Sequence, residues 1–237
     1  MSLDACVGAW FMRLFSQFWS SQSEVVEVWS LKVRSDLHLA RKAYHFFGVC
    51  IIIALYQVLT REQGLYAICV STLVFLFIDF LRLRIPFVNR LAYATFGPFL
   101  RKEEMKKFSA MSYLLGGALL VIVFFPRPVG LLAFLFLAIG DPVSSIVGIL
   151  YGKDKILGNK SMQGTLAGFI VCTFISILYF QATGIMMDRL ILVGLLGGLI
   201  GAFCELVPIW KMDDNFTIPV LSATLLYVMF LLFGGFN

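Results

Sequence analysis

Long apolar runs alternate with short polar stretches along this chain, and the length of the runs predicts its fold class. Several runs approach the about 20 apolar residues that a helix needs to cross a bilayer, and we count seven spans. They lie near residues 43–60, 64–82, 110–125, 128–150, 163–183, 188–205 and 216–235. Spanning strands are excluded, because an open sheet edge leaves backbone groups unsatisfied in hydrocarbon. The pattern therefore predicts an all-α, polytopic membrane bundle of about seven transmembrane helices.

Two other segments predict helices that lie on the membrane surface. In the loop 82–109, apolar residues recur at helical spacing between arginines, which is typical of an interfacial amphipathic helix. Before the first span, large apolar residues share one helical face: Val7, Trp10, Phe11, Leu14, Phe15 and Phe18. We therefore divide the chain into an interfacial segment, residues 1–37, and a membrane-embedded domain, residues 38–237. The start lacks the basic residues and apolar core of a signal peptide, so we expect none.

Composition and charge agree with a membrane protein and predict its orientation. Only 14% of the residues are charged, against about 25% in soluble domains, and we expect no nucleic-acid partner. Sixteen lysines and arginines fall in the N-terminal segment and the loops 82–109, 151–162 and 206–215, and three fall on the opposite side. The positive-inside rule predicts that the N-terminus and these loops are cytoplasmic and the C-terminus is not. Attraction to anionic headgroups would also explain many of these charges.

The fourth span contains Asp141 followed by Pro142, and an aspartate inside a membrane indicates function by default. Proline disfavours helical geometry in the preceding residue, and Asp-Pro is typical of a helix start. We therefore predict a broken helix here, with a half-helix from Pro142 to about Tyr151 whose free N–H groups would attract an anion. One face of that half-helix is small or polar: Ser144, Ser145, Gly148 and Gly152. Close packing of helices would explain that face as well.

The loop after the fourth span combines glycines with lysines, a composition that suits phosphate binding. Glycines allow close backbone approach to an anion and lysines neutralise it. The residues concerned are Gly152, Lys153, Lys155, Gly158, Lys160, Ser161 and Gly164. The spacing of a Walker A loop is absent, and an ordinary cytoplasmic turn would have a similar composition.

Two further polar groups should face the same side of the membrane. Glu205 ends the span 188–205, which carries a glycine stripe at 194–201 on the same face. Asp213, Asp214 and Asn215 follow that span. Clustered carboxylates near a phosphate site suggest Mg²⁺, which binds few protein carboxylates and shares phosphate oxygens. A solvated loop with Asn215 as a helix N-cap is the plainer interpretation. At the start of the first span, Arg41, Lys42 and His45 adjoin on one face. They could contact phosphate. Alternatively, Arg41 and Lys42 only mark the cytoplasmic end of the span, and His45 forms a hydrogen bond to a neighbouring helix.

Taken together, these motifs resemble the family of CTP-dependent lipid kinases, which includes dolichol kinase, phytol kinase and fungal CTP-dependent diacylglycerol kinase. The resemblance runs from about residue 38 to 230. It rests on Arg41-Lys42 with His45, the segment 79–89, the stretch from Asp141 to Gly164, and the run 213–219. The segment 79–89 and the run 213–219 match the diacylglycerol kinase branch best. The resemblance implies transfer of the γ-phosphoryl group of CTP to a lipid hydroxyl, with Mg²⁺ or another divalent cation, and its closest branch implies diacylglycerol as the acceptor.

The resemblance also implies roles for individual residues. Asp141, Asp213 and Asp214 would be catalytic and would hold the metal, with Glu205 as a further metal ligand. The nucleotide and its phosphates would be bound by Arg41, Lys42, Gly148, Gly152, Lys153, Lys155, Lys160, Ser161 and Gly164. Supporting positions would be His45, Asp79, Ser144, Ser145 and Asn215. Pro142 departs from the family pattern, in which a small hydroxyl residue is frequent at this position.

Alternatives to this interpretation differ in substrate or in class. A polyprenol or phytol would enter an apolar pocket as readily as diacylglycerol. A CTP–phosphatidate cytidylyltransferase should carry a Pro-Gly-His-Gly-Gly run, and residues 206–214 do not have it. A transporter usually shows two matching halves, and no second copy of the Asp141 motif occurs. The glycine stripe 194–201 could pack within one chain or between two, which leaves the oligomeric state open.

Overall fold

The computed structural model describes residues 39–96, 102–158, 160–207 and 212–236. The predicted surface helix before the first span, and with it the segment 1–37, lies outside these residues. Within them, each of the seven predicted spans is an apolar helix: α2 (Leu39–Val58), α3 (Arg61–Arg84), α5 (Ala110–Phe124), the rod of α6 (Arg127–Leu135), η3 (Phe136–Gly140) and α7 (Asp141–Tyr151), α8 (Met162–Thr183), α9 (Leu190–Leu206) and α10 (Asp214–Phe233).

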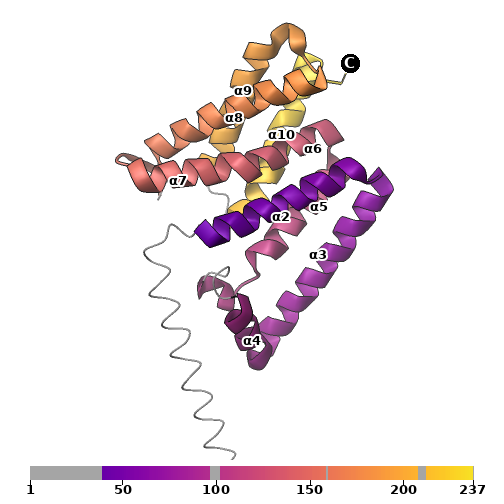
Figure 1. Ribbon diagram of the computed structural model, residues 1–237, viewed down its shortest axis with the longest axis vertical. Coiled ribbons are helices and arrows are strands. Elements are labelled where there is room, and N and C mark those ends of the chain that lie inside the picture. The colour runs from indigo at the N-terminus through magenta and orange to yellow at the C-terminus, as the bar shows by residue number, and fades with distance from the viewer. Residues whose placement is uncertain (1–38, 97–101, 159, 208–211, 237) are drawn as a thin grey trace, which may run out of the picture.

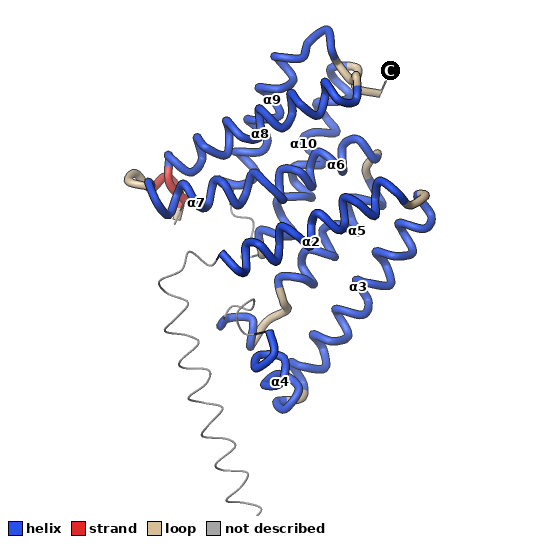
Figure 2. Tube along the Cα trace, viewed as in Figure 1, coloured by secondary structure: helices blue, strands red, loops and turns tan. Residues whose placement is uncertain are grey.

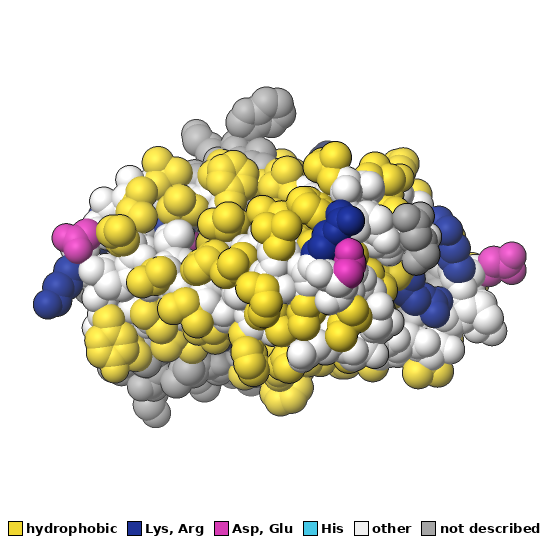
Figure 3. Space-filling model, turned by 90° about the horizontal axis from the view of Figure 1, so that it is seen from above, with side chains coloured by type: hydrophobic (Ala, Val, Ile, Leu, Met, Phe, Trp, Pro, Cys, Tyr) yellow, Lys and Arg dark blue, Asp and Glu magenta, His cyan; other side chains and the backbone are white. Residues whose placement is uncertain are grey.

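Length and composition support membrane insertion of these helices. Among the described residues, five helices are long and apolar enough to cross a membrane: Arg61–Arg84, Arg127–Tyr151, Met162–Thr183, Met187–Leu206 and Asp214–Phe233. Two shorter apolar helices, Lys42–Val58 and Ala110–Phe124, accompany them. Hydrophobic side chains are spread over the whole face in Figure 3, and charged side chains are few on it. The predicted all-α, polytopic membrane bundle is confirmed.

The helices pack into one bundle around large buried side chains. In Figure 1, α7, α8 and α9 lie next to one another, and α3 runs obliquely along the opposite edge. The helix α10 packs against α5, α6 and α9, and joins the two parts of the bundle. Phe134, Phe136, Phe180 and Phe230 are fully buried at this junction. In Figure 1 the hairpin end of α7 and the start of α2 lie toward the left and the segment after α3 lies at the lower end, whereas the turns α2–α3 and α8–α9 and the C-terminus lie toward the right and top, as the alternation of spans predicts.

The glycine stripe on α9 packs against α8 of the same chain. A Cβ atom at Gly198 would overlap the Thr173 side chain, and one at Gly201 would meet the Cys172 side chain at 2.5 Å. Gly197 lies in the same way against Ser176. The stripe therefore lets two helix backbones approach closely within one chain.

The predicted break at Asp141 is wrong. The helix of the fourth span continues through this position, with a local change from α-helical to π-helical hydrogen bonds. Residues Phe136–Gly140 form a π-helical turn, and the Asp141 N–H donates to the Phe136 carbonyl five residues back. Gly140 (φ −60°, ψ −53°) and Asp141 (φ −62°, ψ −49°) are both helical, and Figure 1 shows α6 and α7 as one rod. Pro142 has no N–H to donate and its ring crowds an ordinary α-helical turn, so a wider turn just before it relieves both problems. Asp141 is therefore not an N-cap, and no free half-helix start lies there.

The loop between α7 and α8 contains a small hairpin that the sequence did not predict. Strand β1 (Lys155–Leu157) pairs antiparallel with β2 (Lys160–Ser161). Gly158 has a positive φ of 57°, which glycine adopts without strain. Figure 2 shows the hairpin in red beside the end of α7 and the start of α8. It stands outside the helices, so it does not conflict with the exclusion of spanning strands.

The loop 82–109 forms the predicted helix, α4 (Pro86–Phe96), followed by a short 3₁₀ turn, η2 (Lys102–Met105). Beneath it, Arg82 donates from Nε to Asp79 Oδ1 at 2.6 Å, and its other nitrogens donate to the carbonyls of Glu104 and Lys107. The second Asp79 oxygen accepts from the Ser109 N–H and hydroxyl and from the Ser112 hydroxyl, at 2.6 to 2.9 Å. Asp79 therefore ties the loop to α3 and α5.

Candidate functional site

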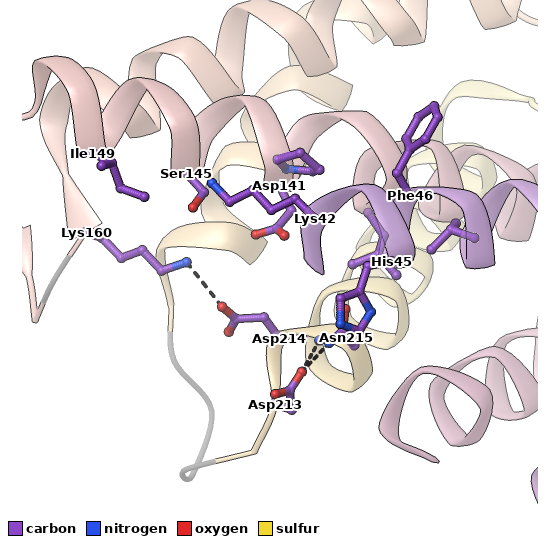
Figure 4. A pocket seen from close by; sticks show the side chains of 13 residues that line it. Lys42, His45, Phe46, Asp141, Ser145, Ile149, Lys160, Asp213, Asp214 and Asn215 are labelled. Atoms are coloured by element: carbon purple, nitrogen blue, oxygen red, sulfur yellow. Dashed lines mark hydrogen bonds and ion pairs between the residues drawn. The ribbon is translucent and has the colours of Figure 1, made fainter. Parts of the chain in front are cut away.

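A polar cavity of about 170 Å³ lies where α2, α7, the hairpin and the start of α10 meet. Figure 4 shows its side chains pointing inward from these separate parts of the chain. The lining residues are Lys42, His45, Phe46, Val49, Leu137, Asp141, Pro142, Ser145, Ile149, Lys160, Asp213, Asp214 and Asn215. The cavity thus combines basic, acidic and apolar side chains near the ends of membrane helices.

Lys160 joins the acidic groups of the site. Its Nζ lies 2.7 Å from Glu205 Oε1 and 3.4 Å from Asp214 Oδ2, and Asp141 interacts electrostatically with Lys160 and with both carboxylates. Burial lowers the pKa of Lys160, but the carboxylates of Asp214, Glu205 and Asp141 raise it by more, so the pKa lies above its usual value of 10.5. Lys160 is therefore a fixed cation at neutral pH, in contact with Glu205 and Asp214 and in the field of Asp141.

The opposite wall comes from the first turns of α2. Lys42 extends toward Ser145 and Asp141, and His45 points toward Asn215 (Figure 4). Both line the cavity. Together with Lys160, Lys42 brings a second cation to a cavity that also contains Asp141. The Arg41 side chain lies outside the described part of the chain.

The start of α10 supplies the floor. Asp213 is the N-cap of this helix, and its carboxylate accepts from the Asn215 N–H at 3.0 Å. The interpretation of Asn215 as the N-cap is wrong by two residues, because Asp213 already has the extended backbone of a cap (φ −73°, ψ 141°). The free helix N-terminus beside the cavity is thus that of α10, because the helix before Asp141 continues into α7 without a break.

Several residues predicted to touch phosphate lie where α7 packs against α8. A Cβ at Gly164 would lie 2.7 Å from the Ser144 carbonyl oxygen, and one at Gly152 would lie 2.6 Å from Ser161 Oγ. Gly148 lies against the same Ser161 hydroxyl, which also accepts from the Gly164 N–H as the cap of α8. These five residues are not among those that line the cavity.

The remaining predicted residues lie outside the cavity. Lys153 and Lys155 are exposed near the hairpin, and the Lys153 N–H donates to Gln163 Oε1. Asp79 belongs to the network under α4. Glu205 lies behind Lys160 and is 6% exposed.

Apolar lining residues were missed in the sequence, although their spacing carries a signal. Phe46 and Val49 follow Lys42 by four and seven residues, and Ile149 follows Asp141 by eight. These intervals place each pair on one helical face. A search for apolar residues at helical spacing from Lys42 and Asp141 would have found them.

The carboxylates of the site suit a metal ion that is also bound by a phosphate better than one that is bound by protein side chains alone. Among the described residues, no group of three or more His, Cys, Asp or Glu side chains is placed to hold a metal ion. Asp141 and Asp214 nevertheless line one cavity, and Glu205 Oε2 is buried without a hydrogen-bond partner. Mg²⁺ commonly binds one or two carboxylates together with substrate phosphates. The residues therefore fit a divalent cation that arrives with a nucleotide.

Comparison with known proteins connects this site to lipid phosphorylation. No family model and no solved structure matches the chain. The chain is 32% identical to CTP-dependent diacylglycerol kinase 1 of Schizosaccharomyces pombe over 161 residues, 64% of this chain and 74% of that protein. It is 27% identical to CTP-dependent diacylglycerol kinase 1 of Saccharomyces cerevisiae, over 78% of this chain and 71% of the relative. It is 31% identical to probable phytol kinase 2 of Glycine max, over 64% of this chain and 55% of that protein.

Proposed function

Because the chain belongs to the family of CTP-dependent lipid kinases, we propose that it phosphorylates diacylglycerol with CTP. The γ-phosphoryl group of CTP is transferred to the free hydroxyl of the lipid, and the products are phosphatidate and CDP. The fungal relatives are named for this donor and this acceptor. The plant relatives are phytol kinases, so phytol is the second acceptor to test.

The observation that carries the proposal is the meeting of Lys42, Asp141, Lys160 and Asp214 in one cavity of a membrane bundle. Phosphoryl transfer demands positioning and neutralisation of charge more than covalent chemistry by the protein. Two cations and two carboxylates beside apolar walls meet that demand. The apolar walls, Phe46, Val49 and Ile149, suit a lipid acceptor.

The two lysines act on the phosphates. Lys160 keeps its proton because of the carboxylates around it, and its charge is available to a phosphate that enters from the cavity. Lys42 approaches from the facing helix (Figure 4). Charge-assisted hydrogen bonds from both sides orient the triphosphate and stabilise the charge that develops on the transferred group.

Asp141 acts on the acceptor. Its carboxylate accepts a hydrogen bond from the lipid hydroxyl and takes the proton as the oxygen attacks the γ-phosphorus. A new oxygen–phosphorus bond forms on the lipid, and the bond from the γ-phosphorus to the bridging oxygen of CDP breaks. The π-helical turn before Asp141 sets the direction of this carboxylate, and such turns are frequent at functional sites.

Asp214, with Glu205 behind it, is the candidate pair for the divalent cation. When bound, the cation neutralises charge on the nucleotide phosphates. Asp213 holds the start of α10 in place by capping it, and thereby positions Asp214. The site faces the cytoplasm in this proposal, because CTP is a cytoplasmic nucleotide and the basic loops gather on that side of the bundle.

The test is a phosphoryl-transfer assay with purified full-length protein in mixed micelles. The protein is given γ-labelled CTP or ATP, Mg²⁺, and diacylglycerol, phytol or a polyprenol. We expect labelled phosphatidate with CTP. Labelled phytyl or polyprenyl phosphate would change the acceptor and keep the mechanism.

Two results would contradict the proposal. Release of pyrophosphate from CTP with phosphatidate as substrate would identify a cytidylyltransferase. Absence of any labelled lipid, with protein that is folded and monodisperse, would exclude lipid kinase activity for these acceptors.

A further inference from the structure

A second cavity, of about 210 Å³, lies between α2, α3 and α5. Its lining is apolar except for Tyr56 and Ser71: Gly48, Ile51, Ile52, Leu55, Tyr56, Leu59, Gly64, Ala67, Ile68, Ser71, Phe75, Met111, Leu115 and Ile122. We refer to it as the α2–α3 groove. None of the residues placed in the polar site belongs to it.

The groove opens on the lipid-facing surface of the bundle. Ile51 and Leu55 on its rim are 59% and 48% exposed, whereas Ile52, Ile68 and Ile122 on its floor are buried. Gly64, Ala67 and Ser71 follow one another at helical spacing on α3 and leave its wall concave. An exposed apolar hollow of this kind in a membrane domain is accessible to hydrocarbon chains and not to water.

One face of α2 connects the groove to the polar site. His45 lines the polar cavity, and Gly48, Ile52, Leu55 and Leu59 continue along the same helical face into the groove. From Gly48 to Val58, where α2 ends, the helix rises about 15 Å at 1.5 Å per residue. This is roughly half of the 30 Å hydrocarbon core, and so about the depth of one leaflet.

We propose that the α2–α3 groove binds one acyl chain of the lipid acceptor. This inference rests on the proposed function, because the bound chain belongs to the lipid whose hydroxyl reaches Asp141. A chain seated in the groove runs away from the polar site along α2, so the end of the lipid that carries the hydroxyl lies beside His45 and the polar cavity.

The groove contributes more to the orientation of the acceptor than to its binding affinity. A lipid chain is already in hydrocarbon before it binds, so burial in the groove adds little hydrophobic free energy. Orientation of a reacting group is sensitive to displacements of about 1 Å, which can cost 10²-fold in rate. Filling the groove should therefore impair turnover of an acceptor with long chains more than that of one with short chains.

The structure offers a matched pair of variants. Ala67 lines the groove on α3, whereas Ala54 is exposed on α2 and lies outside it. Ala67→Leu and Ala54→Leu make the same chemical change inside and outside the groove. Gly64→Leu is a second filling variant, because a Cβ there meets only the Tyr56 ring, at 4.0 Å, and displaces no backbone.

The experiment measures kcat/KM for dioleoylglycerol and for dioctanoylglycerol at saturating CTP. We expect Ala67→Leu and Gly64→Leu to lower the value for dioleoylglycerol about tenfold or more, and the value for dioctanoylglycerol much less. Ala54→Leu should match the unmodified protein with both acceptors. An equal loss with both acceptors, or no loss with either, would overturn the role of the groove.

Photolabelling tests whether an acyl chain occupies the groove and does not depend on enzyme activity. Full-length protein in nanodiscs is irradiated with a diacylglycerol that carries a diazirine in one acyl chain, and the labelled peptides are identified. We expect labels within 48–59 and 64–75 that unlabelled diacylglycerol removes and phosphatidylcholine does not. Equal competition by phosphatidylcholine would identify ordinary bilayer lipid, and crosslinks between two chains would identify a second copy; either result overturns the proposal. If the unmodified protein phosphorylates no lipid, the proposed function fails, and selective labelling would still support a diacylglycerol-binding groove.

Discussion

Replacement of Asp79 by alanine should destabilise the protein severely without altering its chemistry. The carboxylate accepts four hydrogen bonds, from Arg82 Nε and from Ser109 and Ser112. The side chains of both Asp79 and Arg82 are only 3% exposed. Alanine would leave the Arg82 charge buried without its counter-ion and the Ser109 N–H without its acceptor.

The expected cost follows from this burial. Removal of one partner from a buried ion pair costs about 3–5 kcal/mol, and solvent does not screen this pair. For a chain of this size, about 1 kcal/mol corresponds to roughly 2–4 °C in Tm, so we expect Asp79→Ala to lower Tm by roughly 6–20 °C. The control is Asp188→Ala, which removes the exposed partner of Arg189; exposed pairs contribute about 1 kcal/mol or less.

The assay is thermal unfolding of the detergent-solubilised protein, with the KM for CTP measured on the fraction that stays folded. We expect a lower Tm and an unchanged KM, because Asp79 does not line the polar cavity. A variant that unfolds within 2 °C of the original protein but has lost turnover would refute the structural role of Asp79 and would assign it to catalysis.

The other predictions concern the polar site and the packing of α9. Asp141→Asn should abolish turnover and leave the protein monodisperse in detergent; activity within tenfold of the original would exclude Asp141 as the base. Lys160→Met should lower kcat/KM for CTP by about 10²–10³-fold. The pKa of Lys160 is raised in the folded protein. The charged Lys160 side chain therefore contributes its full stabilisation below the ordinary lysine pKa, and this stabilisation is lost only as the pH rises through the raised pKa. The difference in Tm between Lys160→Met and the original protein should therefore be the same at pH 7 and pH 9, and a difference that shrinks toward pH 9 would contradict the raised pKa. Chelation of divalent cations should stop turnover, and added Mg²⁺ should restore it. Activity that persists in chelator would contradict the need for a divalent cation. Gly198→Leu should destabilise the protein by about 1–3 kcal/mol or more through overlap with Thr173, whereas Leu199→Met, on the exposed side of the same helix, should leave Tm nearly unchanged.

Much of the candidate site could be predicted from the sequence, through its residue types and its family resemblance. Asp141, Lys160 and Asp214 were expected to act together, and all three line one cavity. Lys42 and His45 were expected beside them, and they form its opposite wall. Polar side chains within apolar runs are costly to bury, so their positions are informative even without coordinates.

Other assignments depended on how helices rotate and approach one another. Gly148, Gly152 and Gly164 fit a phosphate loop and a packing surface equally well by sequence, and the contacts with Ser144 and Ser161 favour packing. The ion pair between Lys160 and Glu205 joins residues 45 apart in the chain, and no local pattern indicates it. The π-helical turn at Phe136–Gly140 arises because Pro142 must be accommodated in a helix that its neighbours hold continuous.

The sequence by itself determined that this is a helical membrane protein and where its apolar helices lie to within a few residues, and it predicts which loops share a side. Hydrocarbon requires every spanning backbone group to bond within its own helix, so run length and alternation suffice for these conclusions. Only the tertiary structure decided which polar residues meet, that the α9 stripe packs on α8, and that an apolar groove adjoins the polar cavity. These features depend on the rotation and spacing of whole helices, which small differences in packing at many contacts set together.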